Sequence, residues 1–152
     1  MFPDSTLKWR PFPSIIDGIK PPPFALSKGM WRGAFNLIVV ECVPGTRAYG
    51  IEIIGCQVDA AFEEMIYSIA NHGDRAGAYD GGVYIKEAET SHLLDLWARI
   101  DPFKRKVRHF SFVGGDHCYE ALGTTDPVIR AFASPEEAYA WRPDRDVEGH
   151  GT

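Results

Sequence analysis

The sequence predicts an α+β fold, with a mainly antiparallel sheet, two main helices on one face and a proline-rich N-terminal arm. Short β-branched apolar runs are joined by tight-turn signals, which is typical of hairpins. Two stretches space their apolar residues as helices do, and strands and helices lack the regular alternation of a doubly wound parallel sheet. The 152 residues, of which 45% are hydrophobic and 24% charged, indicate one globular domain.

The N-terminal segment, residues 1–33, is predicted to form an arm without regular helix. It holds six of the eleven prolines, including the run at 21–23, and proline is excluded from helix interiors. Its many aromatic and isoleucine side chains make it too apolar for a free linker, so we expect it to pack onto the domain at 34–141. Residues 142–152 are polar and are predicted to be a frayed tail.

A first hairpin is predicted after the arm. Ala34–Val43 and Tyr49–Cys56 are both apolar and rich in β-branched residues. Pro44 and Gly45 lie between them, and these two residue types suit successive turn positions.

A first helix is predicted to follow this hairpin. Asp59 is a suitable N-cap, and Asn71 and Gly73 indicate the end of the helix. Its apolar stripe, spaced as in a helix packed on a core, consists of Phe62, Met65, Ile66 and Ile69.

A second helix is predicted after a glycine-rich loop and a short strand at Val83–Ile85. Thr90 or Ser91 can cap this helix, and it ends at Asp101 because the residue before a proline is pushed out of the α region. The apolar residues on one face are Leu93, Leu96, Trp97 and Ile100.

A second hairpin is predicted from Val107–Val113 and Cys118–Leu122. Gly114 and Gly115 begin the intervening turn, where we expect them to provide positive φ angles.

The C-terminal part is predicted to contain a short strand and a helix. Pro127–Phe132 has the composition of a strand. Ser134 is a suitable N-cap, Pro135 suits the first helical position, and the helix should reach about Trp141.

Sequence motifs for phosphate, zinc and dinucleotide binding are missing, so no catalytic residue, metal or cofactor is predicted. His109, His117 and Cys118 could converge across the second hairpin, as metal ligands or as a thiol nucleophile with its base, and the sequence leaves this open. The wide spacing of Cys42, Cys56 and Cys118 predicts buried free thiols.

Charge is distributed unevenly along the chain. The formal net charge is −5, and residues 34–103 alone carry four basic and eleven acidic side chains. Nucleic acid binding is disfavoured, because phosphate recognition needs concentrated lysine and arginine. The sequence lacks the roughly 20-residue apolar stretch of a membrane span and a secretory leader pattern, which favours a cytoplasmic location without membrane contact. The acidic middle segment suggests a basic protein partner.

Residues 83–132, about a third of the chain, contain a series of short motifs. These motifs are Glu89, Ser91, His92, Leu93, Asp101-Pro102, Arg108-His109-Phe110 and Glu120-Ala121-Leu122. In this order they resemble a pattern of small bacterial immunity-type and uncharacterised proteins. The resemblance implies a non-enzymatic binder that occludes a bacterial toxin, and a basic toxin such as a nuclease would suit the acidic segment.

The expected function is therefore a protein-binding domain of the immunity type. The candidate partner-binding surface combines acidic, imidazole and aromatic side chains, namely Glu87, Glu89, His92, Asp95, Asp116, His117 and Tyr119. Two alternatives stay open: a small enzyme with a Cys/His or carboxylate site, and a structural domain without a ligand. A homo-oligomer is also compatible with the sequence, because edge strands can pair between copies.

Overall fold

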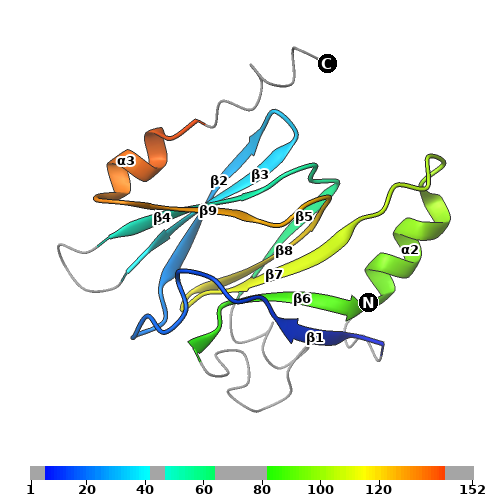
Figure 1. The fold of residues 1–152 in the computed structure, drawn as a ribbon, viewed down its shortest axis with the longest axis horizontal. Coiled ribbons are helices and arrows are strands. Elements are labelled where there is room, and N and C mark those ends of the chain that lie inside the picture. Colours follow the sequence, from blue (N-terminus) through cyan, green and yellow to red (C-terminus); the bar gives the residue numbers. More distant parts are fainter. Residues whose placement is uncertain (1–5, 42–46, 64–81, 143–152) are drawn as a thin grey trace.

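The computed structural model describes residues 6–41, 47–63 and 82–142, and these residues form a mainly-β protein with two antiparallel sheets and two short helices (Figure 1). A five-stranded sheet has the order β1-β6-β7-β8-β5, and a four-stranded sheet has the order β2-β3-β4-β9. The elements are β1 (Lys8–Pro11), β2 (Phe24–Trp31), β3 (Ala34–Val40), β4 (Ala48–Ile53), β5 (Val58–Glu63), β6 (Ile85–Thr90), α2 (His92–Ile100), β7 (Arg108–Val113), β8 (His117–Gly123), β9 (Val128–Phe132) and α3 (Pro135–Ala140). The antiparallel pairing was predicted, but the fold is mainly β and not α+β, and two sheets replace the single predicted sheet.

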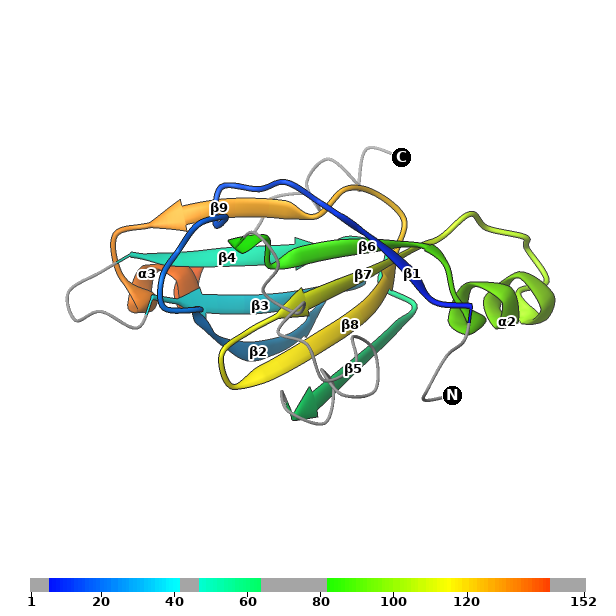
Figure 2. The same ribbon diagram turned by 90° about the horizontal axis from the view of Figure 1, so that it is seen from below.

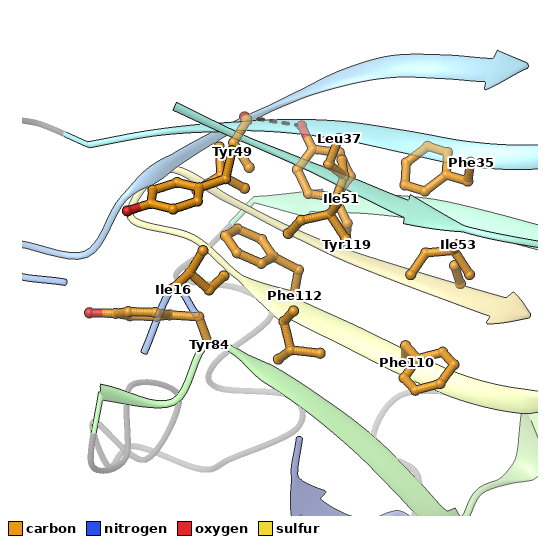
Figure 3. Close-up of a cluster of buried hydrophobic side chains, with 14 of the residues drawn as sticks. Ile16, Phe35, Leu37, Tyr49, Ile51, Ile53, Tyr84, Phe110, Phe112 and Tyr119 are labelled. Atoms are coloured by element: carbon orange, nitrogen blue, oxygen red, sulfur yellow. Dashed lines mark hydrogen bonds between the residues drawn. The ribbon is translucent and has the colours of Figure 1, made fainter. Parts of the chain in front are cut away.

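The main core lies between the two sheets. Because successive side chains of a strand point to opposite faces, Phe35 and Leu37 of β3 face the same interior as Phe110 and Phe112 of β7. Figure 3 shows these side chains converging with those of the neighbouring strands. Each such side chain, when fully buried, contributes about 1.5–3 kcal/mol by leaving water.

Both predicted hairpins are confirmed where the structure describes them. β3 pairs with β4 from Phe35 opposite Ile53, although the predicted turn at 44–46 lies outside the described residues. β7 pairs with β8, but Gly114 and Gly115 do not have the predicted positive φ angles. They are required for close approach instead, since a Cβ atom would lie 2.7 Å from the His117 carbonyl oxygen at Gly114 and 2.9 Å from the Pro22 carbonyl oxygen at Gly115.

The first predicted helix is wrong at its start, because Val58–Glu63 is strand β5. Asp59 lies inside this strand opposite Ala121 of β8, and so does not cap a helix. The apolar spacing on which the prediction depended begins only at Phe62, and pairing with a distant strand decides the structure before it. The rest of that predicted helix lies outside the described residues.

The two C-terminal helix predictions are confirmed, including both caps. The hydroxyl oxygen of Ser91 accepts a hydrogen bond from the Leu94 amide at 3.1 Å, and that of Ser134 accepts one from the Glu137 amide at 3.2 Å. The strand predicted at Val83–Ile85 is displaced: β6 begins at Ile85 and continues to Thr90, which leaves Ser91 as the cap of α2.

The helices do not share one sheet face, which corrects the predicted layer arrangement. Helix α3 covers the outer face of the four-stranded sheet, where buried Ala138 packs with Ile38 and Ala48. Helix α2 projects from the opposite end of the molecule, as Figures 1 and 2 show from two directions. None of its residues is buried. Among the described helices, none has the length and apolar character needed to cross a membrane.

The described part of the predicted arm contributes a strand to each sheet. β1 pairs with β6 and β2 pairs with β3, both antiparallel. Pro11 ends the edge strand β1, a position where the missing amide hydrogen is tolerated. In the segment that connects β1 to β2, the side chain of Ile16 is fully buried in the main core.

Candidate functional site

The seven predicted partner-binding residues lie in two groups at opposite ends of the five-stranded sheet. This separation follows from the antiparallel register, in which Ile85 of β6 lies opposite Phe112 and Ala88 lies opposite His109. The group near α2 consists of Glu87, Glu89, His92 and Asp95. The group at the β7–β8 turn consists of Asp116, His117 and Tyr119. The structure therefore does not bring all seven onto one surface.

The side chains of the turn group mainly contact the backbone of strand β2. The carboxylate of Asp116 accepts a hydrogen bond from the Ala25 amide at 3.3 Å, and the buried Tyr119 hydroxyl donates to the Ala25 carbonyl at 3.4 Å. Burial raises the pKa of Tyr119. The amide of Gly115 donates to the Pro23 carbonyl at 2.9 Å, so these groups together occupy part of the free edge of β2. Only His117 of this group is exposed.

In the group near α2, Glu87 is buried in an ion-pair network. Its carboxylate lies 3.1 Å from the Arg10 guanidinium and accepts two hydrogen bonds from Arg108, at 2.7 and 2.9 Å. Hydrogen bonding from Arg108 lowers the pKa of Glu87. Arg108 also pairs with Asp126 and lies over the Phe110 ring. Glu87 therefore ties three strands together at the edge of the core, and its charge is already neutralised.

A buried chain of hydrogen bonds, which the sequence analysis did not identify, joins Ser91, His109 and Glu120. The Ser91 hydroxyl lies 2.9 Å from Nδ1 of His109, and Nε2 of His109 contacts the Glu120 carboxylate. The three residues are 1%, 3% and 7% exposed. Because Ser91 also accepts the Leu94 amide, every atom is satisfied when its hydroxyl donates to Nδ1 and Nε2–H donates to Glu120. Trp9 packs edge-on against the imidazole, with ring centroids 5.1 Å apart.

Serine, histidine and glutamate also form hydrolytic triads, but here the arrangement of the three side chains serves to hold the fold together. A nucleophilic serine must reach the substrate and have oxyanion donors beside it. The Ser91 hydroxyl is buried and already holds the first turn of α2. The cavity between the sheets, of about 20 Å³, has room for about one water molecule and not for a substrate. The hydrogen-bond chain thus fixes the N-terminus of α2 to β7 and β8.

The proposed cysteine and metal sites are not assembled among the described residues. Cys118 lies opposite Val113, and His109 lies opposite Leu122. Cys118 and Leu122 are four residues apart on β8, so Cys118 and His109 lie about 13 Å apart along the strand direction. Cys56 and Cys118 are buried free thiols, as predicted, and burial raises the pKa of Cys56 to about 11. Cys42 lies outside the described residues. No cluster of three or more ligand-type side chains occurs in the described ranges.

Helix α2 exposes apolar side chains. Leu96 is 44% exposed, Ile100 is 58% exposed, and Phe103, just after the helix, is 77% exposed. Leu96 and Ile100 are four residues apart and lie on one side of α2, and Phe103 lies in the turn that follows; we call these three residues the α2 patch. A surface helix normally buries its apolar stripe, but here Leu93, Leu94 and Trp97 are only partly covered.

Asp101 fixes the turn that carries Phe103. Its buried carboxylate accepts the backbone amides of Phe103 at 3.1 Å and Arg105 at 2.8 Å, and it also binds the Arg105 guanidinium. The hydrogen bond from Arg105 is the largest cause that lowers the pKa of Asp101 to about 2. Arg105 lies over the rings of both Trp97 and Phe103. The α2 patch is therefore held in place at both ends of the helix.

Comparison with known proteins gives no family assignment: no protein-family model, no curated protein and no solved structure matches this chain.

Proposed function

We propose that this chain is a non-enzymatic protein-binding domain that recognises a partner protein through the α2 patch. The single observation that carries the proposal is the exposure of Leu96, Ile100 and Phe103 on helix α2 and the turn after it, both of which are held by hydrogen bonds. Exposed apolar side chains grouped on one rigid element are typical of interaction surfaces.

Rigidity supports a binding role for this helix. The Ser91–His109–Glu120 chain holds its N-terminus, and Asp101 holds the turn that follows it. Association is costly when loops and side chains must be ordered, and a surface fixed in advance avoids much of that cost. An amphipathic helix with apolar side chains four residues apart, such as Leu96 and Ile100, can lie in a complementary groove.

The narrower form of the proposal is an immunity-type protein that occludes a toxin. It rests on the resemblance of residues 83–132, a stretch that contains α2 and the Ser91, His109 and Glu120 positions. The broader proposal, a protein-binding domain, does not depend on that resemblance.

The proposal is tested by comparing paired variants in affinity capture from a native lysate. The test variant is Ile100→Ser with Phe103→Ser. The matched control is Ile15→Ser with Leu26→Ser, which removes two aliphatic side chains that are also exposed but lie outside the α2 patch. We expect the wild type and the control to recover the same stoichiometric protein, and the test variant to lose it. Equal recovery by all three proteins, or recovery of none, would overturn the proposal.

A further inference from the structure

We infer that the partner segment recognised by the α2 patch is acidic, with aspartate or glutamate side chains next to apolar ones. The inference rests on the proposed function and adds the chemistry of the partner.

Basic side chains border the C-terminal half of the α2 patch. Arg99, Lys104 and Lys106 are exposed and lie within three residues of Ile100 or Phe103 along the chain. The ammonium group of Lys104 donates to the Ala98 carbonyl at 3.1 Å. Within the described ranges, neither Arg99 nor Lys106 forms an ion pair. Two full positive charges are therefore available beside the most exposed apolar side chains.

Carboxylates near these residues offset only part of their charge. The Asp101 carboxylate is buried and already bound by Arg105. Asp95 is exposed and lies four residues before Arg99, so it offsets part of the charge of Arg99 but not that of Lys104 or Lys106. The C-terminal end of the α2 patch is thus positive although the whole chain has a net charge of −5.

The acidic count that suggested a basic partner includes carboxylates that cannot face any partner. Glu52, Glu87 and Asp101, all within residues 34–103, are buried. The prediction of a basic partner stays a prediction, and charge complementarity at the α2 patch favours the opposite sign.

A protein segment fits this surface better than a membrane or a nucleic acid. The latter two present one sign of charge, whereas α2 carries Asp95 in its first turn and Arg99 in its last. A peptide can place apolar side chains on Ile100 and Phe103 and carboxylates on Arg99 and Lys106. Carboxylate bonds to these cations are charge-assisted and stronger than neutral ones.

The experiment selects random 12-residue peptides, displayed on phage, on the immobilised full chain. The charge variant is Arg99→Glu with Lys106→Glu, and its matched control is Lys20→Glu with Arg130→Glu, two exposed cations outside the α2 region. The apolar variant is Ile100→Ser with Phe103→Ser. We expect the wild type and the matched control to enrich peptides in which acidic residues exceed basic ones. The charge variant should bind these peptides at least tenfold more weakly.

The outcomes separate the inference from the proposed function. Peptides with a basic excess or no charge bias, bound by the wild type and lost with the apolar variant, would overturn the inference alone. Tighter binding of the wild type to phosphatidylserine vesicles or to a DNA duplex than to the selected peptides would also overturn it. Enrichment that survives in the apolar variant, or no enrichment at all, would overturn both. A neutral variant, Arg99→Gln with Lys106→Gln, should lose part of the affinity, which separates loss of attraction from new repulsion.

Discussion

Replacing Ser91 with alanine should destabilise the protein more than the loss of an ordinary helix cap. The substitution removes the hydrogen bond to the Leu94 amide, and losing an N-cap costs about 1 kcal/mol. It also leaves the buried Nδ1 of His109 without its 2.9 Å partner, and an unsatisfied buried polar group costs about 1–3 kcal/mol. The free energy of unfolding should therefore fall by about 2–4 kcal/mol.

The matched control for this substitution is Ser134→Ala. Ser134 caps α3 through the Glu137 amide at 3.2 Å and is not part of the buried chain, so it should cost about 1 kcal/mol. For a chain of this size each kcal/mol lowers Tm by about 2–4 °C, which predicts a fall of about 4–16 °C for Ser91→Ala. Urea unfolding followed by tryptophan fluorescence, and thermal unfolding followed by circular dichroism, measure both variants.

A double-mutant cycle isolates the bond between Ser91 and His109. The cycle compares Ser91→Ala, His109→Phe and the double variant, and phenylalanine keeps an aromatic ring at position 109. Residues in contact show coupling energies of about 0.5–3 kcal/mol. If Ser91→Ala is no more destabilising than Ser134→Ala, or if the coupling is zero, the buried chain does not fix α2 as described.

Three further predictions concern the sheets and the turn. Gly123→Ala places a Cβ atom 2.5 Å from Cγ2 of Ile53 between the sheets, so it should cost about 1–3 kcal/mol in urea unfolding, and a neutral effect would contradict the packing. The pKa of Asp101 is lowered to about 2 by Arg105, so its stabilising contribution is fully present above its unfolded value of about 4 and is lost as pH falls through 2. Asp101→Asn should therefore reduce the fall in unfolding free energy between pH 5 and pH 2, and an unchanged fall would exclude this role. Glu87→Gln leaves two guanidinium groups facing a neutral amide and should cost about 1–3 kcal/mol, whereas a change below about 0.5 kcal/mol would show that the pairs contribute little.

Features encoded by neighbouring residues were predictable from the sequence. The caps at Ser91 and Ser134 are local, and both helices begin where predicted. The hairpins were also predictable, because strands that adjoin through a short turn pair with each other. Strand β5 was missed because β8, with which it pairs, is distant in sequence, and nothing within Val58–Glu63 indicates that pairing.

The candidate site was harder to predict, because exposure and pairing depend on the whole fold. Glu87 looked like a surface acid, but Arg10 and Arg108 reach it from strands that the sequence analysis could not align with it. His109 and Glu120 each carried the signal of a polar residue alternating with apolar ones, but not the register that joins them. The exposure of Phe103 has no local sequence signal, because an apolar side chain after a helix is as compatible with a buried position as with an exposed one.

The contacts on the edge of β2 also affect how the protein resists self-association. A long edge strand with exposed Phe24 and Leu26 is a template on which other chains can add strands. Asp116 and Tyr119 already occupy the Ala25 backbone groups that an incoming strand would need. Strand addition at Ala25 therefore requires the β7–β8 hairpin to separate from β2 first. Opening of this hairpin would expose that part of the β2 edge to another chain.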